Sequence, residues 1–158
     1  MHRGVGGNDI WEWRTDGSRP ASAVMTTPFD EEGVRLSPDG RSVSFTSNVS
    51  GRHELYVSPF PPSGGQSRVS IGGASAARWS RDGHELFYTG FEGKLMTAPV
   101  RPGLPPTFGA PLALFQMPRR WLDFDVDAPG RFLAVVSESR PDVQPLTVVV
   151  NWTAALDR

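Results

Sequence analysis

The chain has 158 residues, of which 38% are apolar, so it is long enough for one domain with a sizeable core. Its 16 basic and 17 acidic side chains give a formal net charge of −1, which excludes the strongly basic surface typical of nucleic-acid-binding proteins. With no cysteine, the chain has neither disulfides nor thiolate metal ligands. Because the net charge is close to zero, we expect no nucleic-acid partner.

Membrane insertion by this chain is not expected either. The longest strongly apolar run, residues 146–150, is far shorter than the roughly 20 residues that a membrane-spanning helix needs. Residues 1–7 lack the apolar central region of a signal peptide. We therefore expect no targeting signal in these residues.

Residues 8–29 and 30–73 form the first two predicted units. The first unit holds two short strands, one of them at residues 9–12. The second contains a turn, in which Ser37 takes the first position, Pro38 presets φ at the second, and Asp39 and Gly40 close it. Around this turn we predict four strands, because apolar and polar residues alternate directly after it, and two further short strands are expected at 54–57 and at 66–70.

Residues 74–117 repeat the pattern of the second unit. The turn residues Ser80, Asp82 and Gly83 follow their counterparts after 43 residues. The strand at 85–88 carries apolar residues on both faces, which predicts that it lies between two neighbouring sheets. Prolines between residues 99 and 106 predict a loop, and a fourth strand is expected at 111–115.

The last unit, residues 118–158, contains a degenerate copy of the turn at residues 127–130 and three predicted strands. Asp123, Asp125 and Asp127 alternate on its opening strand and are expected to project to one face. Two interpretations remain open. These side chains line a central channel and contact a ligand, or they lie on an exposed sheet face.

Four short strands in about 43 residues, without helical periodicity, are typical of a propeller blade. We predict an all-β fold class: one incomplete β-propeller domain over residues 1–158, with about 3.7 antiparallel blades and 13 strands. It comprises a half blade (8–29), two four-stranded blades (30–73 and 74–117) and a three-stranded last blade (118–158). We expect a C-terminal fragment of a larger propeller. Its open blade face would meet the missing blades or allow self-association.

The stretches at residues 8–11 (with 16–17 after them), 36–41 and 79–83 resemble the TolB-type, WD-like propeller repeats of bacteria. This resemblance implies a propeller of the six-bladed type. Residues 46–48, 50–52, 54–61, 93–96 and 146–152 are similar to the C-terminal propellers of bacterial receptor-type serine/threonine kinases. That narrower resemblance implies an extracytoplasmic position, in the periplasm or at the cell surface, and a kinase domain N-terminal to the propeller. The sequence contains none of the kinase motifs.

Catalytic, metal-binding and cofactor-binding residues are not expected. The sequence has no Gly-x-Ser-x-Gly elbow, and its three histidines lack metal-ligand spacing. Of the five tryptophans, Trp11, Trp79 and Trp152 occupy apolar strand positions and are predicted to pack between blades. Trp13 and Trp121, nearer the strand ends, are candidate ligand contacts together with the three aspartates.

Two functional hypotheses follow. The first is a non-catalytic module that binds a protein or a small ligand through the loops and channel of one face. The alternative is the C-terminal piece of an enzyme, either a receptor serine/threonine kinase or a propeller-bearing peptidase, whose catalytic domain lies outside this chain. Fold alone does not decide between them.

Overall fold

The computed structural model describes residues 7–103, 105–127, 130–137 and 146–149, and all regular elements in this part of the chain are β-strands. The 14 strands pair antiparallel with their neighbours in four sheets. No helix long and apolar enough to cross a membrane occurs among these residues. The predicted all-β fold class is confirmed.

The first two sheets follow the chain order. The first sheet contains only β1 (Ile10–Glu12) and β2 (Ser22–Met25). The second sheet contains β3 (Glu31–Leu36), β4 (Ser42–Ser47), β5 (Glu54–Pro59) and β6 (Ser67–Arg68). Each strand of the second sheet pairs with the next one along the chain, so it is a simple meander.

The third and fourth sheets are also antiparallel, although the third is not a simple meander. The third contains β7 (Ala74–Trp79), β8 (Glu85–Gly90), β9 (Lys94–Arg101), β10 (Thr107–Phe108) and β11 (Leu112–Gln116). The fourth contains β12 (Trp121–Val126), β13 (Phe132–Ser137) and β14 (Leu146–Val149). Residues 128–129 of the last predicted turn, and Trp152, lie outside the described residues.

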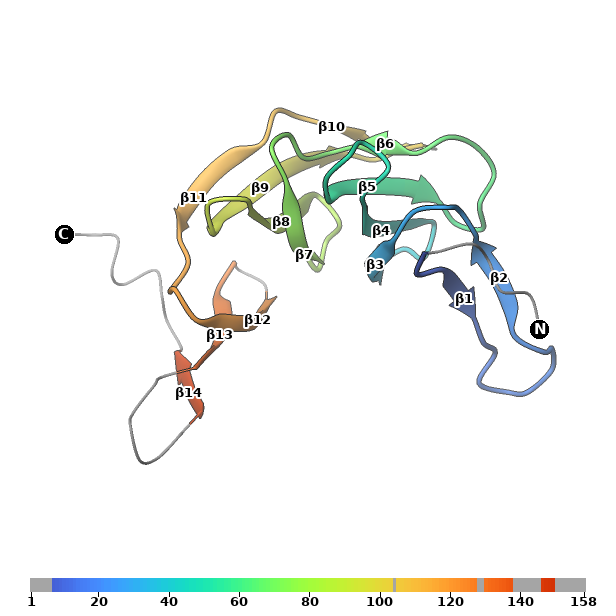
Figure 1. Cartoon of the computed structure of the whole chain (residues 1–158), viewed down its shortest axis with the longest axis horizontal. Coiled ribbons are helices and arrows are strands. Elements are labelled where there is room, and N and C mark those ends of the chain that lie inside the picture. Colours follow the sequence, from blue (N-terminus) through green and yellow to red (C-terminus); the bar gives the residue numbers. More distant parts are fainter. Residues whose placement is uncertain (1–6, 104, 128–129, 138–145, 150–158) are drawn as a thin grey trace.

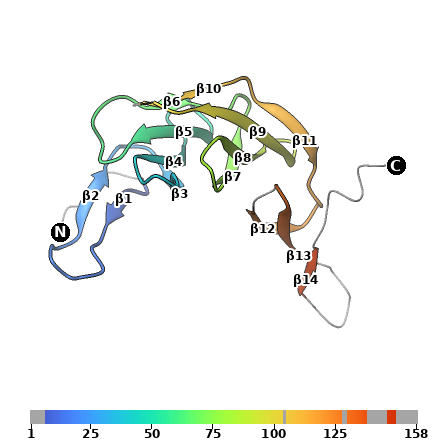
Figure 2. The ribbon, with the colours of Figure 1, turned by 180° about the vertical axis from the view of Figure 1, so that it is seen from behind.

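The four sheets follow one another along an arch (Figure 1). The first strands of three sheets, β3, β7 and β12, lie on its concave side, and β6, β10 and β11 lie on its convex side. The view from behind shows the same order (Figure 2). This radial arrangement of antiparallel sheets is propeller-like.

Pro99 corrects the prediction of a loop over residues 99–106. It lies inside β9, opposite Glu85 of β8, and the short strand β10 brings the count to 14 where the sequence predicts 13. Proline is tolerated because the N–H of Val100 bonds to His84 on the β8 side, so the position of the missing N–H faces the other edge. There the partner of β9 changes from β10 to β11, and no ladder bond is lost.

The repeated turn has the same hydrogen bonds in both copies. The Ser37 hydroxyl donates to Asp39 Oδ1 (2.6 Å) and accepts from the Ser42 N–H (2.9 Å), while the Gly40 N–H donates to the Ser37 carbonyl (2.9 Å). Gly40 has a φ of +68°, which L-residues rarely adopt. The same bonds recur at Ser80, Asp82, Gly83 and Glu85. The turn residues are therefore structural elements that join the first strand of each sheet to the second.

Apolar clusters join the sheets pairwise. Ile10 meets Val43 and Phe45 between the first and second sheets. The cluster between the second and third sheets includes Leu55, Leu86 and Tyr88. The cluster between the third and fourth sheets includes Phe87, Leu95 and Phe124. Alternate residues of β8 thus serve different clusters, and the prediction of apolar contacts on both faces is confirmed. Each such fully buried side chain contributes about 1.5–3 kcal/mol.

Candidate functional site

A cavity of about 500 Å³ lies on the concave side of the arch, where the first strands of the second, third and fourth sheets come together. This volume is within the usual range for small-ligand sites. We call it the inner cavity, and it is lined by Arg35, Arg78, residues 123–125, Leu133 and Val135. Its walls therefore carry two cations, two carboxylates and an apolar surface.

Arg35 and Arg78 occupy equivalent positions in neighbouring sheets. Each stands two residues before the serine of the repeated turn, 43 residues apart. In each arginine, Nη1 donates to the carbonyl of the preceding residue, at 2.7 Å for Arg35 and 2.8 Å for Arg78. The shared geometry indicates that the repeat itself positions both guanidinium groups at one level of the concave surface.

The charge of Arg78 is compensated within the protein. Its Nη2 atom donates to Asp123 Oδ1 at 2.6 Å, and its guanidinium carbon lies 5.5 Å from the centre of the Phe124 ring. Charge-assisted bonding and the cation–π contact both restrict this side chain. Arg78 therefore links the third sheet to the fourth at the floor of the inner cavity.

Arg35 is different, because within the described ranges no carboxylate lies at ion-pair distance from its guanidinium group. Its side chain is exposed. Its backbone carbonyl accepts a bond from the Trp79 indole N–H (3.4 Å), which holds β3 against β7. Arg35 thus presents an uncompensated positive charge on a backbone that the neighbouring sheet fixes.

The three predicted aspartates separate into two groups. Asp123 and Asp125 stand opposite Val135 and Leu133 of β13, share their face, and line the inner cavity. Asp127 lies in the turn after β12, where Arg131 Nη2 donates to it at 2.5 Å. This bond from Arg131 lowers the pKa of Asp127 below its ordinary 3.8. Asp127 is thus committed to the turn and does not line the inner cavity.

The two candidate tryptophans also lie apart from each other. Trp121 packs into the core between the third and fourth sheets, edge-on to Phe124 at 6.4 Å between ring centroids. Trp13 is 71% exposed and lines a second, larger cavity. Trp11, predicted to pack between blades, is 46% exposed and lines the same cavity. The prediction for Trp11 is wrong, because no inner strand covers its side of the first sheet in the described part of the chain.

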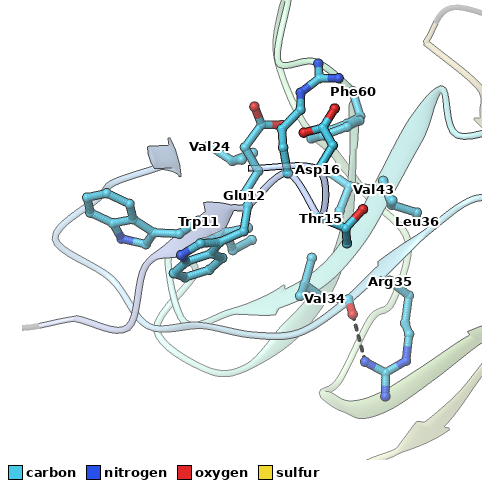
Figure 3. Close-up of a pocket in the computed structure, with 13 residues that line it drawn as sticks. Trp11, Glu12, Thr15, Asp16, Val24, Val34, Arg35, Leu36, Val43 and Phe60 are labelled. Atoms are coloured by element: carbon cyan, nitrogen blue, oxygen red, sulfur yellow. Dashed lines mark hydrogen bonds between the residues drawn. The ribbon is translucent and has the colours of Figure 1, made fainter. Parts of the chain in front are cut away.

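This second cavity, of about 720 Å³, lies between the first sheet and the second (Figure 3). We call it the β1 groove, and it is lined by residues 10–16, Val24, 34–36, Val43 and Phe60. Figure 3 shows Arg35 at the far end from Trp11, with its guanidinium group bonded to the Val34 carbonyl. The β1 groove is mainly apolar. Of the charged groups of the inner cavity, Arg35 also lines the β1 groove, whereas Arg78, Asp123 and Asp125 lie outside it.

The acidic residues of the repeated turns satisfy local donors. A bond from the Ser37 hydroxyl, then one from the Arg41 N–H, lowers the pKa of Asp39. For Asp82 the pKa is lowered by the His84 N–H and then by the Ser80 hydroxyl. Among the residues that the structure describes, no group of three or more His, Asp and Glu side chains is placed to hold a metal ion.

Arg35 and Arg78 are functional candidates that were not predicted from the sequence. The signal that could identify them is their 43-residue separation, which equals the separation of the turn serines. A charged residue that recurs at the same position of a repeat lies at the same place on successive sheets.

Comparison with known proteins bears on the fold. No protein-family model matches the sequence, and no curated protein matches it. Oligogalacturonate lyase from Vibrio parahaemolyticus is similar in structure over 82% of this chain and 36% of its own, with 12% identity and a TM-score of 0.57. A 6-phosphogluconolactonase-like protein from Bacteroides uniformis is similar over 89% of this chain and 47% of its own, with 18% identity and a TM-score of 0.54. These likenesses show a propeller-like fold, and the chain spans less than half the length of either structure.

Proposed function

We propose that this chain is a non-catalytic binding module that takes a small polar ligand with an anionic group in the inner cavity. The observation that carries the proposal is the uncompensated guanidinium group of Arg35, which opens onto the same cavity as the carboxylate of Asp125. The guanidinium group of Arg35 would bind a carboxylate or phosphate with two parallel hydrogen bonds. The carboxylate of Asp125 would accept bonds from hydroxyl groups of the same ligand.

A sugar acid combines these two kinds of group. Its anionic end fits Arg35, its hydroxyl groups fit Asp125, and its apolar ring face fits the wall formed by Leu133 and Val135. The names of the two similar structures refer to an oligogalacturonate, which is a sugar-acid oligomer, and to a phosphogluconolactone, which is the lactone of a phosphorylated sugar acid. Those names motivate the choice of probes.

Binding without catalysis is favoured by how the carboxylates are engaged. Asp123 Oδ1 accepts bonds from both Arg78 and the Phe124 N–H, at 2.6 and 2.9 Å. Carboxylate-pair hydrolysis needs two available carboxyl groups, one as an acid and one as a base or nucleophile. In the inner cavity, Asp125 is the one carboxylate without a cationic partner among the described residues.

The test is calorimetric titration of the chain with trigalacturonate and with 6-phosphogluconate at low ionic strength. We expect Arg35→Gln to weaken binding at least tenfold, because a charge-assisted bond is worth about 1.5–3 kcal/mol. Arg41→Gln is the matched control, since Arg41 lies outside the inner cavity and should bind as the wild type does. Equal affinities for the two variants, or no binding of either probe to the folded chain, would refute the proposal.

A second candidate function is that of an enzyme. Both similar structures carry enzyme names, and each is more than twice as long as the part that this chain covers. In that case the chain is a portion of an enzyme. Its test is an absorbance assay for unsaturated products from oligogalacturonate. Product formation that Asp125→Asn abolishes would favour the enzyme over the binding module.

We also propose that the chain works outside the cytoplasm as part of a larger bacterial protein. The support for this is the sequence resemblance to kinase-associated propellers. Protease digestion of intact spheroplasts that express the tagged protein tests the location. Complete protection from external protease would contradict it.

A further inference from the structure

The first strand of the second sheet has an apolar face that its counterparts keep buried. Val34 of β3, Ala77 of β7 and Phe124 of β12 each stand three residues before the turn that ends their strand. Ala77 and Phe124 are both 2% exposed, whereas Val34 is 41% exposed. Leu36, two residues further on, is exposed as well. This position of the repeat is therefore buried in the third and fourth sheets and exposed in the second.

The cover at the next junction identifies what is lacking here. β7 packs against β3, β4 and β5 of the sheet before it. Ala77 shares a buried cluster with Leu55 and Val57 of β5. At the first junction β3 packs against β1, which belongs to a sheet of two strands. The β1 groove lies where an inner hairpin would stand, and Val34 and Leu36 form part of its wall.

The edge of the first sheet faces the same place. β1 pairs with β2 along one side, and Figure 1 shows β1 on the concave side of β2. Along its other side no described strand pairs with it. An unpaired edge offers a row of N–H and C=O groups to an incoming strand.

We propose that the β1 groove docks a two-stranded antiparallel hairpin of the β3–β4 type. Its outer strand pairs with the free edge of β1, and its apolar face lies on Val34 and Leu36. We choose a hairpin as the occupant because it would contact β3 in the way that the β3–β4 hairpin contacts β7 in the next sheet. Docking completes the first sheet to four strands and covers Trp11. The proposal does not depend on ligand binding in the inner cavity.

The experiment mixes the full chain with a backbone-cyclised peptide of residues 30–48, whose hairpin structure is verified beforehand by NMR. We expect saturable 1:1 binding, a blue shift of tryptophan fluorescence, and slower hydrogen exchange at the β1 amides that do not bond to β2. Val34→Glu should reduce the affinity at least tenfold. Leu122→Glu is the control, because Leu122 is an exposed leucine of the fourth sheet and should leave binding unchanged.

Three results would overturn the proposal. The folded hairpin does not bind. It binds without protecting β1, or with equal affinity for the two variants. The third is a dimer, seen by light scattering, that Val34→Glu dissociates and that the hairpin does not displace. That result would assign the groove to a second copy of the chain.

Discussion

The buried carboxylate of Glu54 accepts a hydrogen bond from the hydroxyl group of Ser70, 16 residues further along the chain. It also accepts the N–H groups of Gly72 and Gly73, each at 3.0 Å, while the Ser70 oxygen accepts the Leu55 N–H at 2.8 Å. One carboxylate thus fixes the connection from the second sheet to the third. These bonds add to the apolar cluster that packs the second and third sheets together.

Removal of this carboxylate should destabilise the protein strongly. We expect Glu54→Ala to lower the free energy of unfolding by about 3 kcal/mol, because each buried donor left without an acceptor costs about 1–3 kcal/mol. Urea unfolding followed by fluorescence measures the change. Glu92→Ala is the control, since Glu92 is an exposed partner of Lys94 and should change stability by less than about 1 kcal/mol. Similar losses in both variants would contradict this role of Glu54.

Leu86 should be among the most sensitive core positions. Its side chain is 0% exposed and packs in the cluster between the second and third sheets. We expect Leu86→Ala to cost about 2–5 kcal/mol, the usual range for such a truncation, as a lower urea midpoint with an unchanged slope. Leu122→Ala, at a leucine that is 61% exposed, should cost no more than about 0.5 kcal/mol. A small effect at Leu86 would mean that the two sheets do not pack as described.

The turn at Gly40 should reject side chains for backbone reasons alone. A Cβ atom there would meet nothing within 4 Å, yet the φ of +68° strains any L-residue. We expect Gly40→Ala to lower the free energy of unfolding by about 1–2 kcal/mol. Gly64 also has open space around it and no positive φ. Gly64→Ala should therefore leave the free energy of unfolding unchanged or raise it slightly, and an equal loss at both positions would argue against the turn geometry.

Tyr88 should make the protein sensitive to alkali. Burial, and next the charge of Glu54, raise the pKa of Tyr88 from 10.0 to about 12. The folded state holds this proton more tightly than the unfolded chain, so the stabilisation is complete below pH 10.0 and is lost as the pH rises to about 12. We expect the free energy of unfolding to fall across this interval, and to fall less in Tyr88→Phe. Ultraviolet titration of the folded protein that is the same with and without Tyr88 would contradict this.

Much of the fold follows from local sequence. The Ser37 and Ser80 turns were predictable because hydroxyl, carboxylate and glycine at fixed offsets satisfy one another within six residues. The strands after them were predictable from alternation. Pro99 was not, because its tolerance in β9 depends on where two later strands change over. Such long-range pairing leaves no mark in the residues next to the proline.

The candidate site was only partly predictable. Asp123 and Asp125 were singled out by alternation, and they line the inner cavity. Arg35 and Arg78 were not, because single arginines in strands usually lie on a solvated surface, and only the arch brings them together. The exposure of Trp11 was also unforeseen, since an apolar strand position predicts burial only where a neighbouring strand covers it.

The pairwise order of the apolar clusters has a mechanical consequence. Leu86 and Phe87 are adjacent in β8 and pack into different clusters, so the third sheet is coupled to both the second sheet and the fourth. The free energy of such an array is close to a sum of sheet terms and nearest-neighbour couplings. Loosening is then expected to begin at the two-stranded end and to spread inward one sheet at a time, through the second and third sheets, each of which is coupled to a neighbour on both sides.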